Sequence, residues 1–321
     1  MPELSRLAIL DDYQGVARAL GPWERLPDGL RIEVFRDTVS DPDALAERLR
    51  PFDALVIMRE RTPFPRALIE RLPNLRLLVT TGMRNRSVDV AACAEAGVTV
   101  CGTPAFGNPT VDLTWGLILS FARRIPEQER ALREGRWQVA LGTGLEGKTL
   151  GVLGLGNLGA RVARVGAALG MRLVAWSPNL TDARAAEVGA TKVDKAALMA
   201  EADVLTLHVV LSDRSRGIVG ADDIARMKPG AVIVNTSRGP LIDQPALIAA
   251  LKEGRIAGAG LDVYDQEPLP PDHPILSVPN TVLTPHLGYV TEENYRVYFQ
   301  GAVEAVEGYL KGNPVRVLRA D

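Results

Sequence analysis

The chain of 321 residues carries a formal net charge of −2; this length predicts two domains, and the charge argues against binding to nucleic acid or acidic membranes. The N-terminal residues show no secretory leader, and no apolar run is long enough to cross a bilayer, so a cytoplasmic protein is expected. The two cysteines, Cys93 and Cys101, indicate a reducing compartment, and three scattered histidines indicate no metal site.

Short apolar runs alternate with helical patterns along the first hundred residues or so. Strands are expected at residues 7–10, 30–35, 54–58, 75–80 and 98–101. Asp41 followed by Pro42 is typical of a helix start. Residues 65–71 and 88–96 are also expected to be helical. This alternation indicates βαβ units and a parallel sheet.

A connector rich in glycine and proline, "GTPAFGNPT", ends this first series. A long apolar helix at residues 111–122 is expected next. A second series of strands is then expected at residues 150–153, 173–176, 204–207, 231–235, 257–262 and 282–284.

A last helix is expected at residues 292–310, after the stretch "TPHLGYVT". Because this helix follows a complete second sheet, we expect it to return and pack on the first domain. The chain would then cross between the domains near residues 102–108 and 286–291, forming a double hinge.

A glycine-rich turn joins the first strand of the second series to its helix. In "GVLGLGNLG", Gly154 permits the tight turn and Gly156 lets the backbone approach a pyrophosphate. Gly159 allows close packing of the helix on the sheet, and the helix start near Asn157 and Leu158 directs its free N–H groups at phosphates. Because an apolar strand precedes the turn and a helix follows it, dinucleotide binding is favoured over a purely structural turn.

Three further strand ends carry residues that suit chemistry. Arg238 follows one strand, Asp262 and Glu267 follow the next, and His286 follows the last. Taken singly, each residue is best interpreted as structural or solvated. In a doubly wound sheet, however, the carboxyl ends of the strands line the ligand crevice, so these residues meet at the edge that holds the glycine turn.

Together these residues predict hydride transfer between a nicotinamide and a 2-oxo acid. Arg238 suits the substrate carboxylate, since a planar guanidinium binds a carboxylate through two hydrogen bonds. His286 suits the general acid and base at the carbonyl oxygen. Glu267 is assigned to orienting His286, because a carboxylate beside a histidine fixes the ring and favours its protonated form.

Long motifs resemble those of the D-isomer-specific 2-hydroxyacid dehydrogenases, which include 3-phosphoglycerate dehydrogenases and glyoxylate/hydroxypyruvate reductases. The similarity covers nearly the whole chain and includes "GVLGLGNLG", "MKPGAVIVNTSRGPLID", "AGAGLDVYDQEPL" and "LTPHLGYVT". It implies two Rossmann-like α/β domains, one flavodoxin-like and one dinucleotide-binding, with the NAD(P)-binding domain at residues 104–289 inserted into a substrate domain of residues 1–103 and 290–321. It also implies a homodimer built around residues 111–145.

The same resemblance supports the trio of Arg238, Glu267 and His286 and implies further contacts with the cofactor. Thr110, Thr236 and Asp262 are expected near the nicotinamide. His208 and Val209 are expected around the adenosine.

Two departures from the family pattern concern the substrate. The loop "TTGMRNRSVD" places Gly82, Met83 and Arg84 where the family has a glycine-rich substrate loop. Arg84 at a glycine position either adds a second cation for an acidic or polar substrate group or faces solvent. Tyr289 stands where the family commonly has a small residue, and it either contacts the substrate or serves packing.

The cofactor preference depends on Ser177, which stands where the fingerprint expects an acidic residue. A carboxylate would hold the ribose hydroxyls and repel a 2′-phosphate, so Ser177 leaves NADP(H) permitted. No arginine or lysine follows at once to select that phosphate, and Arg184 is expected to be solvated. NAD(H) is therefore slightly favoured.

Two rival functions share the expected fold. Formate dehydrogenases pair their histidine with a glutamine, so Glu267 argues against that activity. A NAD(H)-binding sensor or a corepressor-like scaffold with little turnover can keep the whole trio, so the residues alone leave it open.

Overall fold

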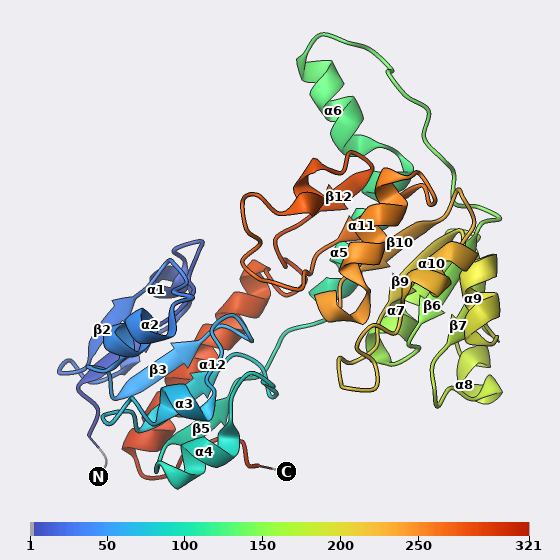
Figure 1. Ribbon diagram of the computed structural model, residues 1–321. Helices are drawn as coiled ribbons and strands as arrows, with labels where there is room; N and C mark the ends of the chain where they lie inside the picture. Colours follow the sequence, from blue (N-terminus) through green and yellow to red (C-terminus); the bar gives the residue numbers. More distant parts are fainter. Residues whose placement is uncertain (1–2, 321) are drawn as a thin grey trace. The chain divides into compact units, whose positions relative to one another are not determined.

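The computed structural model describes residues 3–320. It divides the chain into two compact units, Met1–Gly107 with Val290–Asp321 (unit 1) and Asn108–Tyr289 (unit 2). Each unit is built on its own parallel sheet (Figure 1), which confirms the predicted α/β class.

The first crossing between the units falls after Gly107, four residues beyond the expected break after residue 103. Hydrogen bonds hold the intervening segment in unit 1. The N–H of Gly82 donates to Oγ1 of Thr103 over 2.9 Å. The N–H of Phe106 donates to Oδ1 of Asn294, also over 2.9 Å. Glycine and proline mark the connector, but only these contacts decide where unit 1 ends.

Unit 1 contains a five-stranded sheet of order β2-β1-β3-β4-β5, which is the flavodoxin-like order. Its strands in chain order are β1 (Arg6–Ile9), β2 (Arg31–Val34), β3 (Ala54–Ile57), β4 (Leu77–Thr80) and β5 (Thr99–Gly102). Strands β3 and β4 are buried throughout, as expected for apolar strands covered on both faces.

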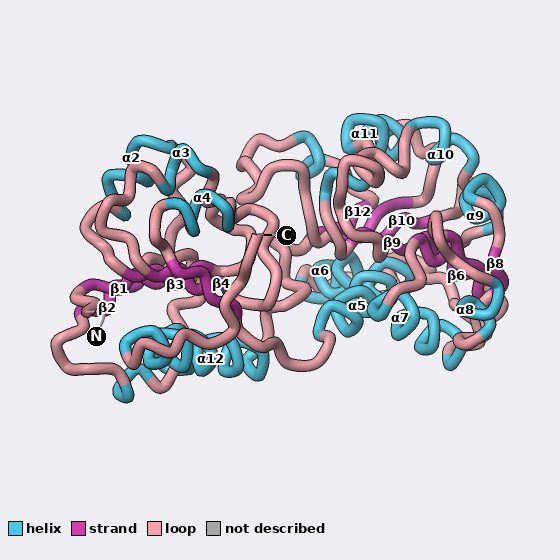
Figure 2. Tube along the Cα trace, turned by 90° about the horizontal axis from the view of Figure 1, so that it is seen from below, coloured by secondary structure: helices cyan, strands magenta, loops and turns pink. Residues whose placement is uncertain are grey.

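Helices cover both faces of this sheet. The helices of unit 1 are α1 (Ala17–Leu20), α2 (Pro42–Leu49), α3 (Arg66–Ile69), α4 (Val90–Glu95) and α12 (Glu292–Leu310), with a 3-10 turn at Trp23–Arg25. Figure 2 shows α2, α3 and α4 on one face and α12 on the other. Helix α12 contacts β4 and β5, so the predicted return of the last helix to the first domain is confirmed.

Unit 2 contains a seven-stranded sheet of order β12-β11-β10-β9-β6-β7-β8. Its strands are β6 (Thr149–Leu153), β7 (Arg172–Trp176), β8 (Thr191–Lys192), β9 (Val204–Leu207), β10 (Val232–Asn235), β11 (Gly258–Leu261) and β12 (Thr281–Leu283). The strand order reverses between β6 and β9. In a doubly wound sheet, the ligand crevice opens at this point, outside the carboxyl ends of the strands.

Two groups of helices sandwich the second sheet, with α5 and α7 on one face and α9, α10 and α11 on the other (Figure 2). The helices are α5 (Pro109–Ala122), α6 (Ile125–Arg133), α7 (Asn157–Ala168), α8 (Asp182–Ala186), α9 (Lys195–Glu201), α10 (Ala221–Arg226) and α11 (Gln244–Lys252), with 3-10 turns at Gly239–Leu241 and Pro274–Ser277. Within residues 3–320, no helix is long and apolar enough to span a membrane.

Candidate active site

The glycine-rich turn lies at the carboxyl end of β6. Gly154 has a φ of +100°, and a Cβ at Gly154 would lie 2.7 Å from the carbonyl carbon of His208, which follows β9. A Cβ at Gly159 would lie 2.0 Å from the carbonyl oxygen of Gly154. These two positions therefore require glycine for the close approach of the turn, strand β9 and helix α7.

The N-terminus of α7 is left open for a ligand. No side chain caps the helix at Gly156, and a Cβ built there meets nothing within 4 Å. Asn157 and Leu158 begin the helix beside this space, with Asn157 exposed. Free N–H groups at the start of a helix, facing open space, are suited to a pyrophosphate.

His208 contributes a buried imidazole beside the turn. Its Nε2 lies 2.9 Å from Oγ1 of Thr206, whereas its Nδ1 is buried and has no hydrogen-bond partner within residues 3–320. Burial lowers the pKa of His208 to about 4, so the ring is neutral near pH 7. An unsatisfied buried nitrogen next to the phosphate turn fits a site completed by a polar ligand such as a dinucleotide.

Ser177 follows β7, at the same edge of the sheet as the turn. Its carbonyl accepts a hydrogen bond from Leu180 over 3.1 Å, which forms a tight turn before α8. Thr181 caps α8 by accepting from the N–H of Arg184. The Arg184 side chain forms an ion pair with Glu187, the residue that follows α8, so this guanidinium already has a carboxylate partner.

Arg238 lies two residues beyond Thr236 at the end of β10, in a loop shaped by Asn235. The Asn235 amide donates to the carbonyl of Arg238 over 2.8 Å and accepts from the N–H of Ser237 over 3.0 Å. A Cβ at Gly239 would lie 2.1 Å from the carbonyl carbon of Tyr264. This glycine therefore lets the loop of Arg238 approach the loop that carries Glu267.

His286 and Glu267 form a direct pair. The distance from Nδ1 of His286 to Oε2 of Glu267 is 2.5 Å, and Oε1 of Glu267 accepts from the N–H of Tyr264 over 2.9 Å. His286 has a φ of +55°, an uncommon conformation for a residue with a side chain. The ring of Tyr289 meets the imidazole edge-on, with centroids 5.6 Å apart.

Asp262 holds the loop in this conformation. Its buried carboxylate accepts from Oγ1 of Thr284 and the N–H of Leu287, each over 2.6 Å, and from the N–H of Gly288 over 2.9 Å. Burial raises the pKa of Asp262, while these hydrogen bonds act in the opposite direction. The loop of His286 is thus fixed to the end of β11 rather than left mobile.

The predicted substrate loop lies in unit 1, after β4. Gly82 is buried with a φ of +85°, whereas Met83 and Arg84 are exposed. A Cβ at Gly82 would lie 2.0 Å from Nη1 of Arg59. The buried Asn85 donates to the carbonyl of Arg59 over 2.6 Å. The loops after β3 and β4 are therefore bonded to each other.

Unit 2 brings the trio, Asp262 and Thr236 to the edge that carries the glycine turn. Sequence reasoning missed several residues that shape the loops carrying the predicted site residues: Asn235, Gly239, Thr114, Arg59 and Asn85. The motif "NTSRG" contained a signal for the first two, since asparagine and glycine flanking an arginine are typical of a tight turn. Thr236, which bonds to Thr114, and Asn85, which bonds to Arg59, lie far from these residues in the chain, so no local pattern marked the two contacts.

The fold and this arrangement together define a nicotinamide-dependent dehydrogenase. Residues 115–288 match the profile of the D-isomer specific 2-hydroxyacid dehydrogenase, NAD binding domain. The chain belongs to the D-isomer specific 2-hydroxyacid dehydrogenase family. It is an oxidoreductase that transfers hydride between a nicotinamide cofactor and C2 of a 2-hydroxy or 2-oxo acid.

Individual relatives cover most of the chain. The glyoxylate reductase of Korarchaeum cryptofilum is 36% identical over 277 residues, which are 84% of this chain and 83% of that protein. The hydroxypyruvate reductase of Blautia hydrogenotrophica is 32% identical over 327 residues, and the alignment covers 98% of this chain and 99% of that protein. The crystal structure of a phosphoglycerate oxidoreductase from Vibrio cholerae O395 has a TM-score of 0.91 and 42% identity to this chain. The match covers 96% of this chain and 99% of that one.

Proposed function

We propose that Arg238, Glu267 and His286 carry the reaction on D-2-hydroxy acids. The observation that carries this proposal is the 2.5 Å contact between Nδ1 of His286 and Oε2 of Glu267. This contact engages Nδ1 of His286, and we assign Nε2 to the substrate oxygen. Arg238 binds the substrate carboxylate through its guanidinium fork.

The chain contributes charge and proton handling to the reaction. When bound, the nicotinamide supplies the hydride for reduction of the oxo acid or accepts it in the reverse direction. During reduction, Nε2 of His286 donates a proton to the C2 oxygen, where negative charge develops. Glu267 keeps the ring oriented through its contact with Nδ1. Oxidation of the hydroxy acid uses the same groups in reverse.

The cofactor is held by the carboxyl edge of the second sheet. Gly154, Gly156, Gly159 and the start of α7 bind the pyrophosphate, which the open helix N-terminus supports. His208 and Val209 border the adenosine, and Thr110, Thr236 and Asp262 surround the nicotinamide. The roles of these five residues are inferred from the family resemblance.

NAD(H) is the proposed cofactor, with weak discrimination against NADP(H). Ser177 has no charge with which to repel a 2′-phosphate. Arg184 is the first basic residue after Ser177 in the chain. Because its guanidinium pairs with Glu187, we do not expect it to bind the 2′-phosphate. A strong preference for either cofactor is therefore not expected.

The substrate side chain is proposed to meet Gly82, Met83, Arg84 and Tyr289. The exposure of Met83 and Arg84 leaves both side chains available to a ligand. The edge-on contact of Tyr289 with His286 supports a role close to the reacting oxygen. Small 2-oxo acids that carry an additional polar or acidic group are the substrates that this set favours.

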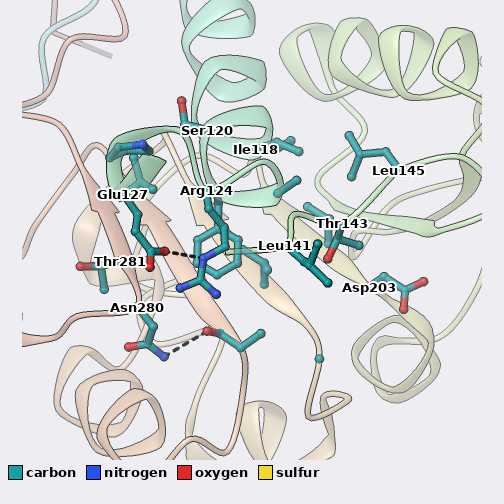
Figure 3. Close-up of a pocket in the computed structure, with 18 of the residues that line it drawn as sticks. Ile118, Ser120, Arg124, Glu127, Leu141, Thr143, Leu145, Asp203, Asn280 and Thr281 are labelled. Carbon is teal, nitrogen blue, oxygen red and sulfur yellow. Dashed lines mark hydrogen bonds and ion pairs between the residues drawn. The ribbon is translucent and has the colours of Figure 1, made fainter. Parts of the chain in front are cut away.

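A homodimer is proposed through α5, α6 and the arm of residues 134–148. A cavity of about 640 Å³ lies between this arm and the amino ends of the strands. Figure 3 shows Arg124 and Glu127, which line this cavity, paired with each other. The arm is tied to the unit, since Gln128 donates to the carbonyl of Ala140 over 2.6 Å. Large apolar side chains nevertheless face outward, with Trp137 76% and Leu141 94% exposed. An ordered surface of this kind favours a second copy of the chain as its partner.

A cytoplasmic location completes the proposal. Cys93 and Cys101 are both free and buried. Burial raises the pKa of each thiol to about 11, so both stay protonated and unreactive. Free thiols are usual in reducing compartments.

An activity grid tests the proposed function. Glyoxylate, hydroxypyruvate, pyruvate, phenylpyruvate and dicarboxylic oxo acids would each be measured with NADH and with NADPH. We expect turnover of several small acids, with the largest kcat/KM for an acid carrying a second polar group. Tight NADH binding without turnover of any acid would overturn the proposal and favour the sensor alternative.

A further inference from the structure

The N-terminal part of α5 carries two threonine hydroxyl groups on one face of the helix. Thr110 and Thr114 are four residues apart, so their side chains lie one above the other. Thr114 is completely buried, and Trp115 and Leu117 of the same helix are buried as well. Burial of a hydroxyl costs free energy unless the hydroxyl is hydrogen-bonded. The hydrogen-bond partners of Thr114 therefore show which loop of the site it holds in place.

Thr110 holds the loop of His286. Its Oγ1 donates to the carbonyl of Gly288 over 2.8 Å, while the N–H of Gly288 donates to Asp262 over 2.9 Å. A Cβ at Gly288 would lie only 3.2 Å from Oγ1 of Thr110. The end of this loop is therefore held between α5 and the end of β11.

Thr114 holds the loop of Arg238. Its Oγ1 lies 2.7 Å from the carbonyl of Thr110 and 2.8 Å from Oγ1 of Thr236. The single proton of Thr114 serves the carbonyl, which can only accept. Thr236 must therefore donate its own proton to Thr114, and this fixes the direction of the bond. Thr236 precedes Arg238 by two residues, in the turn that Asn235 closes.

We propose that Thr110 and Thr114 are positioning residues that set the spacing between Arg238 and His286. The substrate carboxylate and the C2 oxygen are joined by one carbon–carbon bond, so their binding groups must keep a fixed separation. A misplacement of about 1 Å can cost about a hundredfold in rate. Because both hydroxyls belong to one helical turn, they tie the two loops to a common rigid element. This inference rests on the proposed roles of Arg238 and His286.

The two hydroxyls act on different loops, so their loss has different kinetic signatures. Thr114→Val keeps the volume and removes the bond to Thr236; we expect KM for the oxo acid to rise about three- to tenfold, the value of one hydrogen bond, with a smaller change in kcat. Thr110→Val releases the loop of His286; we expect kcat to fall by a similar factor and the solvent isotope effect on kcat to increase, with KM nearly unchanged.

Matched variants separate positioning from general stability. Thr110→Ser and Thr114→Ser keep the hydroxyls and should restore the wild-type constants. Ser277→Ala removes a hydroxyl-to-carbonyl bond of the same 2.8 Å length outside the site and should change neither constant. NADH binding, measured by fluorescence without oxo acid, and the melting temperature would be recorded for every variant.

The outcomes distinguish this inference from the proposed function. Equal changes in kcat and KM that follow the melting temperature, or no kinetic change in either valine variant, would overturn the positioning role. If replacing His286 and Arg238 leaves turnover intact, the proposed function itself fails. A rise in KM in Thr114→Val and a fall in kcat in Thr110→Val, each restored by the serine variant, would support both this inference and the proposed function.

Discussion

Nδ1 of His286 lies 2.5 Å from Oε2 of Glu267, and the other carboxylate oxygen of Glu267 accepts from the backbone of Tyr264 over 2.9 Å. The backbone thus fixes the position of the Glu267 carboxylate, and the carboxylate in turn orients the imidazole. The ring orientation of His286 is therefore set by the fold, and Nε2 is the nitrogen that we propose for proton exchange.

Replacing His286 by alanine should lower kcat for oxo-acid reduction by about two to four orders of magnitude, which is typical of losing a general acid. Glu267→Gln retains the shape but loses the negative charge beside the ring, so a smaller loss of about tenfold to a thousandfold is expected. NADH affinity, measured by fluorescence titration, should stay near the wild-type value in both variants. Unchanged turnover in His286→Ala would remove this residue from the mechanism.

A carboxylate introduced at Ser177 should create strong discrimination against NADP(H), which we propose that the chain lacks. In Ser177→Asp, charge repulsion should raise KM for NADPH by about tenfold or more, while KM for NADH changes little. Arg184→Ala serves as the companion variant, since its side chain already pairs with Glu187. We expect its ratio of NADPH to NADH efficiency to equal that of the wild type. A selective loss of NADPH activity in Arg184→Ala would show that Arg184 does reach the 2′-phosphate.

The buried imidazole of His208 should make stability depend on pH. Burial lowers the pKa of His208 to about 4, below the value of 6.5 for an exposed histidine. Between these values the unfolded chain binds a proton that the folded chain does not, so stability falls as pH drops from about 6.5 to about 4. The loss from this residue should reach about 3 kcal/mol.

His208→Gln is the control for this pH effect, because other groups titrate in the same range and cancel in the difference. Urea unfolding of both proteins without cofactor, from pH 7 to pH 4, measures that difference. The wild type should lose stability relative to the variant as the pH falls. If the free energies of unfolding of the two proteins changed in parallel with pH, His208 would take up its proton as readily in the folded protein as in the unfolded chain, and the prediction would be wrong.

The arm of residues 134–148 should govern self-association. Leu141→Lys and Trp137→Ala each change a side chain that the unit leaves exposed, and each should raise the dissociation constant of the dimer about thirtyfold or more. Leu276→Lys changes another exposed leucine, on the 3-10 turn Pro274–Ser277, and should have no effect. Light scattering across a dilution series gives the molar mass. A wild-type monomer at every concentration would overturn the proposed homodimer.

Local patterns were sufficient wherever a residue acts through its immediate neighbours. Asp41 caps α2, with Oδ1 accepting from the N–H of Ala44 over 2.8 Å, and the sequence predicted this start because aspartate before proline satisfies the free N–H groups of a first turn. Helix α6 was missed because four of its nine residues are charged and Pro126 stands in its first turn, so no apolar run marks the segment. The short strand β8 was missed because two exposed residues carry no alternation.

The sequence by itself determined the alternation of strands and helices, the glycine turn, and the delivery of Arg238, Glu267 and His286 to strand ends, since these follow from spacing along the chain. Tertiary structure alone decided which groups touch. The contact between Gly239 and Tyr264, the hydroxyl pair of Thr114 and Thr236, and the unpaired Nδ1 of His208 all depend on segments far apart in the chain. Hydrogen bonds and close packing act over a few ångströms in space, and only the folded chain brings these partners within that range.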